Sequence, residues 1–116
     1  MILDFSRMRV TLVVTPFDMR AGYRTLAAIA QAVFGVEVDK GGEAVLFVSK
    51  SREICKLIWS DEKGTSLITR KLRRGRFERF LCRANEPATH DFSAEDLNDF
   101  LDGVRIMVQP RSSLSA

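Results

Sequence analysis

The sequence predicts an α+β protein, in which an antiparallel meander of four to five strands packs against two amphipathic helices. Short β-branched and apolar segments follow one another across glycine-bearing turns, which is typical of strands that pair with their sequence neighbours. Two other stretches carry apolar residues at helical spacing. The chain has 116 residues, 46% of them hydrophobic and 28% charged, which fits one domain that buries its own core.

Five segments have the composition of strands. The first is apolar and β-branched and ends at Pro16, since proline cannot donate a hydrogen bond to a strand ladder. Gly75 is the expected turn residue between the last two. The predicted strands cover residues 9–15, 44–49, 54–59, 66–73 and 77–81, and a further short strand is expected at 106–108.

The first predicted helix covers residues 19–34. Asp18 stands at its expected N-cap, where a short carboxylate accepts a hydrogen bond from a free amide and suits the positive end of the helix dipole. Gly35 is the expected C-terminal stop. The predicted apolar face consists of Leu26, Ile29, Ala30 and Val33.

The last predicted helix has a clear start. Ser93 is the expected N-cap, Asp96 completes a capping box, and Phe92 is expected to pack onto Leu97. Gly103 lies near its end. The apolar stripe of this helix consists of Leu97, Phe100, Leu101 and Val104. The predicted core of the domain includes Leu26, Ile29, Phe47, Trp59, Leu97 and Leu101.

The predicted organisation is an N-terminal extension over residues 1–8, a single α+β domain over residues 9–109 and a flexible tail over residues 110–116. The N-terminus has an early acid and lacks the basic flank and cleavage site of a signal peptide. No apolar run approaches the roughly 18 residues that a membrane span needs. We therefore expect a cytoplasmic protein that makes no use of a membrane.

The charge is strongly polarised along the chain, although the net charge is only +3. Residues 50–83 hold eleven Lys or Arg against four acids, whereas residues 84–104 hold six acids and no Lys or Arg. Such a separation creates a strong local field. The acidic last helix is either a solvated face, which is the favoured interpretation, or a docking surface for a basic partner.

The strongest functional signal is the segment 70–79, in which six of ten residues are basic. On a hairpin turning at Gly75, alternate side chains would share one face, and Phe77 would place an aromatic ring among them. A two-stranded ribbon fits the major groove of DNA. The plainer interpretation is a solvated hairpin whose charges protect a sheet edge or pair with the acidic helix.

Three further basic residues, Lys50, Arg52 and Lys56, would widen the same positive surface. Lys56 interrupts an apolar strand and is expected to project from its solvent face. An ordinary surface role for these side chains is as good an interpretation.

Asp18, Met19, Arg20 and Gly22 form a second motif. Arg20 and the free amides of a helix N-terminus could together hold a phosphate. We favour a structural interpretation, in which Asp18 caps the helix and pairs with Arg20 while Gly22 permits close packing.

The sequence favours no enzyme, cofactor or metal site. Cys55 and Cys82 lack zinc-ligand spacing, a single histidine, His90, cannot complete a site, and two free buried thiols are expected. Asp18 and Asp61 are better explained as cap and turn residues than as a metal-binding carboxylate pair. No nucleophile motif and no phosphate-binding glycine loop is present in the sequence.

Several short motifs, in a fixed order, resemble those of a known family. They are Asp18-Met19-Arg20-x-Gly22, Leu46-Phe47-Val48, Lys56-Leu57-Ile58-Trp59-x-Asp61-x-x-Gly64, Arg70-Lys71-Leu72-x-Arg74-Gly75-Arg76-Phe77, and an acid-capped helix with Leu97, Leu101 and Gly103. Over about residues 9–104 the chain is similar to the accessory protein, of TnpB or Orf2 type, of the IS sixty-six family of bacterial insertion sequences. That protein is distinct from the RNA-guided nuclease that shares the TnpB label.

The resemblance implies a protein encoded beside a separate DDE-type transposase and needed for transposition. DNA binding and assembly with the transposase are the roles that it leads us to expect. Residues 50–54 are less basic than the dense arginine run usual at this place in the family, which marks the chain as a divergent member.

We therefore predict a non-catalytic accessory factor of DNA transposition that binds the ends of its element. The alternative is a protein–protein adaptor that binds the transposase without contacting DNA, and the oligomeric state is left open. The predicted nucleic-acid-binding residues are Lys50, Arg52, Lys56, Arg70, Lys71, Arg73, Arg74, Arg76 and Arg79. The predicted structural motif residues are Asp18, Arg20, Gly22, Gly75 and Phe77.

Overall fold

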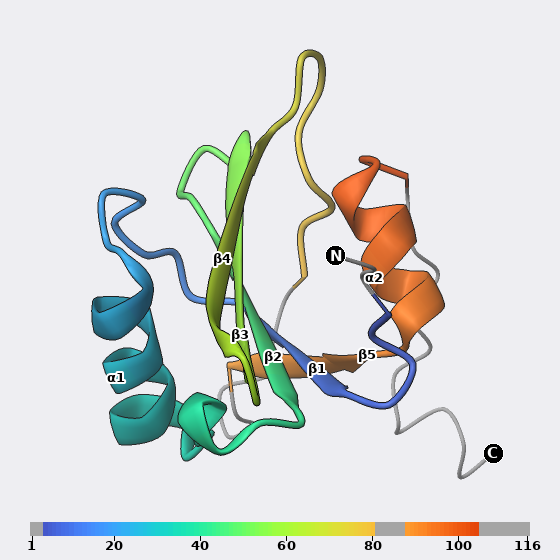
Figure 1. Ribbon diagram of the computed structural model, residues 1–116. Coiled ribbons are helices and arrows are strands. Elements are labelled where there is room, and N and C mark those ends of the chain that lie inside the picture. Colours follow the sequence, from blue (N-terminus) through green and yellow to red (C-terminus); the bar gives the residue numbers. More distant parts are fainter. Residues whose placement is uncertain (1–3, 81–87, 105–116) are drawn as a thin grey trace, which may run out of the picture.

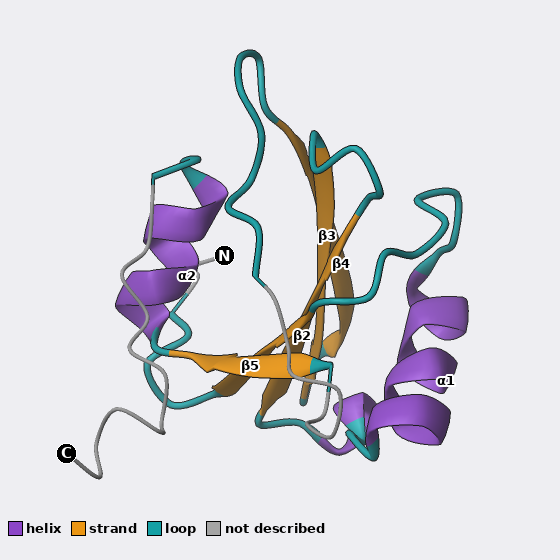
Figure 2. Cartoon of the chain, turned by 180° about the vertical axis from the view of Figure 1, so that it is seen from behind, coloured by secondary structure: helices purple, strands orange, loops and turns teal. Residues whose placement is uncertain are grey.

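The computed structural model describes residues 4–80 and 88–104. Within these residues the chain forms a five-stranded sheet with an α-helix on each face (Figure 1). The view from behind shows the same three layers, with α1 and α2 on opposite sides of the strands (Figure 2). The elements are β1 Arg9–Val13, α1 Tyr23–Phe34, the 3-10 helix η1 Val38–Lys40, β2 Glu43–Val48, β3 Ile54–Asp61, β4 Gly64–Lys71, β5 Thr89–Phe92 and α2 Ala94–Leu101.

The sheet has the strand order β4-β3-β2-β1-β5 and is mostly antiparallel. The predicted α+β class is confirmed, and the predicted meander corresponds to β2, β3 and β4. The exception is the pair β1–β2, which is parallel, with Arg9 opposite Glu43 and Val13 opposite Phe47. The chain leaves β1 through α1, and a helical crossover of this kind returns the next strand in the parallel direction.

The strand predicted at residues 77–81 is wrong over its described part, because residues 77–80 are irregular. The fifth strand is β5, which pairs with β1 and aligns Val10 with Phe92. Its sequence, Thr-His-Asp-Phe, lacks the β-branched run that marks the other strands. The strand predicted at 106–108 lies outside the described residues.

Helix α1 begins at Tyr23, four residues later than predicted, with Gly22 as its N-cap. Asp18 is not the cap, because its carboxylate is used in a turn with Arg20. The helix ends as predicted at Gly35, whose φ of 70° lies in the left-handed region that glycine favours. Val33 is 65% exposed, so the predicted apolar face is wrong at that position.

The start of α2 agrees with the sequence in detail. The Asp96 amide donates to Ser93 Oγ over 3.0 Å, and the Ser93 amide donates to Asp96 Oδ2 over 3.1 Å. This reciprocal capping box satisfies two amides that the helix itself cannot bond. Val104 lies beyond the end of α2 and is 49% exposed, so it is not part of the apolar stripe.

Each face of the sheet carries its own apolar layer. Leu97 and Phe100 of α2 pack on one face, together with Trp59, and Leu26 and Ala30 of α1 pack on the other. Of the predicted core, Leu26, Phe47, Trp59 and Leu97 are buried, while Ile29 and Leu101 are half-buried at the margins of the two layers. Phe5 extends the α2 layer by an edge-on contact with Trp59, with ring centroids 5.2 Å apart.

Neither α1 nor α2 has the length and continuous apolar character needed to cross a bilayer, and the structure describes no other helix that does.

Candidate nucleic-acid interface

The basic segment that follows β4 projects from one end of the sheet as a loop rather than a hairpin of paired strands (Figure 1). Both sides of this loop are tied to the turn between β2 and β3. The Leu72 amide donates to the Glu53 carbonyl over 3.0 Å, and the Phe77 amide donates to the Arg52 carbonyl over 2.7 Å. Residues 73–76 therefore form the free tip, which turns at Gly75 with a φ of 73°.

Phe77 anchors this loop and is not part of its exposed face. Its ring is fully buried and stacks on Phe100 of α2, with centroids 5.0 Å apart. The expectation that the Phe77 ring would stand among the basic side chains is wrong, because the return limb of the loop packs down onto the α2 layer. The ring is consequently unavailable to stack on a base.

Arg52 connects the two basic segments. It adopts a φ of 61°, which is uncommon for a residue with a Cβ atom. In this conformation its carbonyl accepts the Phe77 amide, while its Nη1 donates to the Phe77 carbonyl over 3.3 Å. Arg52 thus holds the return limb of the loop, residues 76–80, beside the β2–β3 turn.

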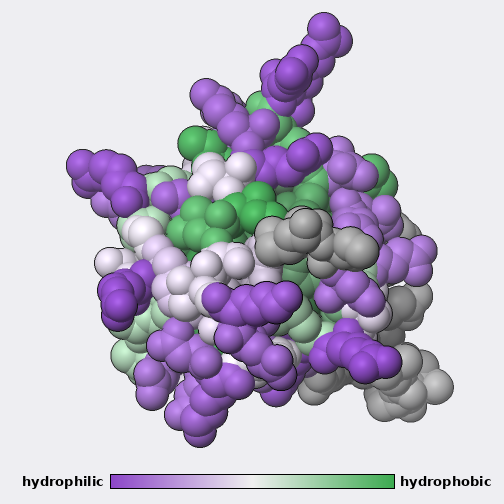
Figure 3. Space-filling model, in the orientation of Figure 1, coloured by the Kyte–Doolittle hydropathy of each residue, from purple (hydrophilic) through white to green (hydrophobic). Residues whose placement is uncertain are grey.

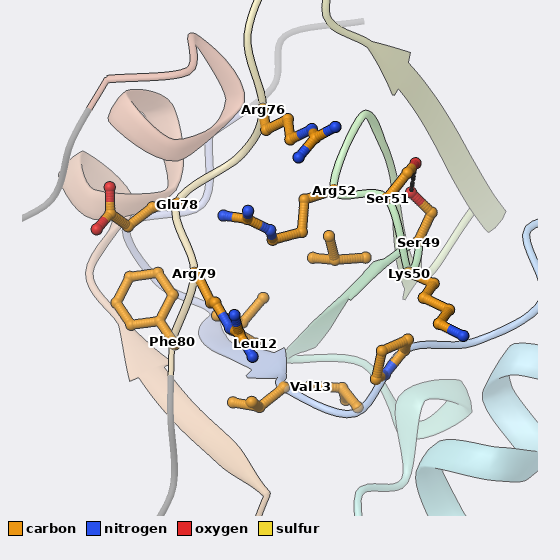
Figure 4. Close-up of a pocket in the computed structure, with 13 residues that line it drawn as sticks. Leu12, Val13, Ser49, Lys50, Ser51, Arg52, Arg76, Glu78, Arg79 and Phe80 are labelled. Carbon is orange, nitrogen blue, oxygen red and sulfur yellow. Dashed lines mark hydrogen bonds between the residues drawn. The ribbon is translucent and has the colours of Figure 1, made fainter.

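An open cleft of about 480 Å³ lies between the β2–β3 turn and residues 76–80. Four basic residues, Lys50, Arg52, Arg76 and Arg79, line it together with one acid, Glu78. Figure 4 shows Arg52 and Arg79 directed into the hollow from the two segments, with Arg76 above Arg52, whereas Lys50 extends away from them. The two parts of the predicted positive surface thus meet at one place.

The tip and cleft carry basic side chains for which the described part of the chain shows no ion-pair partner. The exposed members are Lys50, Lys71, Arg73, Arg74, Arg76 and Arg79. None of their side chains forms an ion pair or hydrogen bond with any residue in 4–80 or 88–104. Hydrophilic side chains accordingly extend from the upper end of the molecule, beyond the end of β4 (Figure 3).

Two of the predicted binding residues form hydrogen bonds to other segments of the chain. Arg70 donates to the Leu101 carbonyl over 2.6 Å and lies 3.5 Å from an Asp102 carboxylate oxygen, so it caps the end of α2. Lys56 does not project freely from the sheet, because its Nζ donates to the Ala21 carbonyl over 2.8 Å. That bond fixes the loop before α1 to the middle of β3.

The Asp18-Arg20-Gly22 motif forms a surface turn. Asp18 accepts the Arg20 amide and pairs with its guanidinium at 2.8 Å, and these hydrogen bonds lower the pKa of the Asp18 carboxyl to about 2. The predicted pair is confirmed. The predicted close packing at Gly22 is wrong, since a Cβ there would meet no atom within 4 Å.

The remaining candidate groups are structural. Cys55 is a free, buried thiol, and burial raises its pKa to about 12, which suppresses the reactive thiolate. Asp61 closes the β3–β4 turn by accepting the amides of Lys63 and Gly64. Among the described residues, no three His, Cys, Asp or Glu side chains are grouped as a metal ion would require. Cys82 lies outside them.

The sequence did not reveal the cleft itself, because its floor comes from the ends of the parallel strands. The chain leaves β1 at Val13 and β2 at Val48, and both residues line the cleft. In open sheets, ligands bind where the carboxyl ends of parallel strands meet. Recognising a helical crossover between these two strands was the signal that could have placed the cleft.

The family model described as "IS66 Orf2 like protein" matches residues 8–111. The chain therefore belongs to this family of insertion-sequence accessory proteins, and the resemblance found in its motifs is confirmed. The uncharacterized protein y4hO of Sinorhizobium fredii (strain NBRC 101917 / NGR234) is 35% identical over 77 residues, which span 66% of each of the two chains. No solved structure matches the chain.

Proposed function

We propose that this protein is a non-catalytic accessory factor of DNA transposition that binds DNA in the cytoplasm through its basic loop and cleft. The observation that carries the proposal is a set of exposed arginines, Arg73, Arg74, Arg76 and Arg79, which form no ion pair with residues 4–80 or 88–104 and lie beside Lys50 and Arg52 of a second segment. Strand cleavage and transfer are left to a separately encoded transposase.

Phosphate contacts would supply most of the affinity. Each phosphate neutralised by Lys or Arg releases condensed counterions, so binding weakens linearly in the logarithm of salt concentration. The tip of the loop, residues 73–76, extends beyond the sheet and beyond the end of α2 (Figure 1), so a duplex backbone is expected to reach it without meeting the acidic helix. Arg70 contributes little in this scheme because Asp102 and the Leu101 carbonyl already hold it.

The test is binding of the full chain to element-end DNA and to a random duplex at about 50 and about 200 mM salt. Replacing Arg73, Arg74 and Arg76 together by alanine should reduce the salt slope by roughly 1 for each arginine. A matched variant removes three charges elsewhere, with Arg24, Lys40 and Lys63 changed to alanine, and Arg70→Ala tests the engaged side chain. Both controls should keep the wild-type slope.

An adaptor that binds the transposase is the competing function. If the protein retains neither DNA at the lower salt concentration but captures the purified transposase, the DNA-binding proposal is wrong and the adaptor function takes its place. A separate assay addresses catalysis. Incubation of DNA with the protein and Mg²⁺ or Mn²⁺ should give no nicked product, and nicking that persists in a homogeneous preparation would contradict the non-catalytic role.

A further inference from the structure

We propose that the cleft between the β2–β3 turn and residues 76–80 receives the base of an unpaired nucleotide, so that the preferred ligand is single-stranded DNA or a frayed element end. This inference rests on the proposed DNA binding and adds the class of DNA. Unlike a simple phosphate-binding surface, the cleft has an apolar floor beneath its basic rim.

The floor is built from the ends of two neighbouring strands and the residues that follow them. It is lined by Leu12, Val13, Val14, Pro16 and Val48. Val14 and Pro16 supply its accessible surface, and the buried Leu12, Val13 and Val48 lie beneath them. Phe80 closes one side of the cleft and is held there by ring contacts with His90 and Phe92, with centroids 5.2 and 5.5 Å apart. The wall is therefore supported from behind by the packed α2 layer.

The rim adds charge above this floor. Arg52 and Arg79 approach from opposite segments, and the Arg52 bond to the Phe77 carbonyl orients its side chain (Figure 4). Guanidinium planes stack on bases, and they also bind phosphate oxygens. An apolar floor below several cations suits a ligand that has a flat apolar part joined to negative charges, as a nucleotide has.

Duplex DNA does not match this arrangement. Its bases are stacked inside the helix, so only its phosphates would reach the rim, and the accessible part of the floor, at Val14 and Pro16, would stay in contact with water. The volume of about 480 Å³ is that of a small-ligand pocket rather than of a groove for a helix. An unpaired nucleotide covers the floor and engages the rim at the same time.

The first experiment uses the unaltered protein and two single strands of equal charge. One is an oligothymidylate about twelve nucleotides long, within the site sizes of single-strand binders, and the other has the same backbone with every base removed. Fluorescence anisotropy at one salt concentration should show the base-bearing strand binding roughly tenfold more tightly. A blunt duplex of equal length presents no unpaired base to the cleft. Its binding free energy per contacted phosphate should therefore match that of the abasic strand.

The second experiment fills the cleft without changing its charge. Val14 is half-buried in the floor, whereas Val33 lies exposed on α1, so Val14→Trp and Val33→Trp are matched variants. Val14→Trp should remove the preference for the base-bearing strand over the abasic strand. Val33→Trp should change neither affinity.

The outcomes separate the two proposals. Equal affinity for the base-bearing and abasic strands would overturn the nucleotide site and leave DNA binding intact. Failure to bind any of the three nucleic acids would overturn both. Competition by a polyglutamate peptide as strong as that by oligothymidylate would show that the cleft takes an acidic peptide instead. The comparison of base-bearing and abasic strands uses the wild-type chain. It therefore tests the nucleotide site even if Val14→Trp lowers the stability of the protein.

Discussion

The basic side chains of this protein fall into two groups that differ in what they touch. Lys56 and Arg70 donate to backbone carbonyls of distant segments, Ala21 and Leu101, at 2.8 and 2.6 Å. The tip arginines, of which Arg73 is the first, touch no acceptor in the described part of the chain. The first group holds the fold together, and the second is available to a ligand.

The contrast shows that a count of charges along a segment does not measure the positive surface that a protein presents. Lys56 lies in the middle of a strand, where its long side chain can reach the neighbouring loop. Arg70 is near the end of β4, within reach of the last turn of α2. Residues 73–76 have left the sheet, and none of their side chains forms an ion pair or hydrogen bond with the described residues of α2.

Phe77 gives the largest expected effect, because it lies beside the free arginines and yet belongs to the core. Phe77→Ala should lower the free energy of unfolding by about 3–5 kcal/mol, whereas the neighbouring Arg76→Ala should change it by less than about 0.5 kcal/mol. Urea denaturation followed by circular dichroism measures both. Similar losses of unfolding free energy in the two variants would contradict the distinction between residues anchored in the fold and residues available to a ligand.

Lys56 tests the first group directly. Lys56→Met keeps most of the aliphatic side chain but removes the hydrogen bond to the Ala21 carbonyl, so it should cost about 1.5 kcal/mol. Lys50→Met is the matched control, since Lys50 is exposed and makes no bond to the described residues, and it should cost less than about 0.5 kcal/mol. A loss in the control as large as in Lys56→Met would contradict the assignment.

Arg52 belongs to the first group by its bond to the Phe77 carbonyl and also lines the cleft. Two substitutions separate its backbone role from its side-chain role. Arg52→Ala and Arg52→Gly both lose the bond to the Phe77 carbonyl, but only glycine adopts a φ of 61° without steric cost. Arg52→Gly should therefore be more stable than Arg52→Ala by about 1 kcal/mol in thermal or urea unfolding. Equal stability would mean that the turn relaxes when the side chain is removed.

The Asp18–Arg20 pair is expected to have the smallest effect on stability, and titration of Asp18 is the best way to measure it. The pKa of Asp18 is lowered from 3.8 to about 2 by its hydrogen bonds to Arg20. A carboxyl with a lowered pKa in the folded state stabilises that state above about pH 4, and the contribution is lost as the pH falls through about 2. Carboxyl-carbon NMR should find the midpoint near 2, and Arg20→Gln should raise it toward 3.8. An unchanged midpoint in the variant would exclude the pair as its cause.

Features that depend on neighbouring residues could be predicted from the sequence. The capping box of Ser93 and Asp96 is a local pattern, and the strands β2, β3 and β4 follow one another across short turns. The parallel pairing of β1 with β2 and the addition of β5 depend on contacts between distant segments, and local composition does not encode them. Recognition of β5 would also have required Thr89-His90-Asp91-Phe92 to resemble a strand, which it does not.

The candidate site was predicted only as a region. The basic composition of residues 70–79 singled out the loop that borders the cleft, and Arg52, which was predicted together with it, lines the same cleft. Composition could not show that Phe77 turns inward, that Arg70 and Lys56 are occupied, or that apolar strand ends form a floor beneath the rim. These are properties of packing across the sheet.

The place of β1 between β2 and β5 has a consequence for biosynthesis. The strand made first is flanked by β2 and by β5, which is made much later. Until Thr89–Phe92 has emerged from the ribosome, the nascent chain carries Val10, Leu12 and their neighbours on an open edge, where other chains can add by strand pairing. Shielding that edge during translation becomes a requirement of the topology.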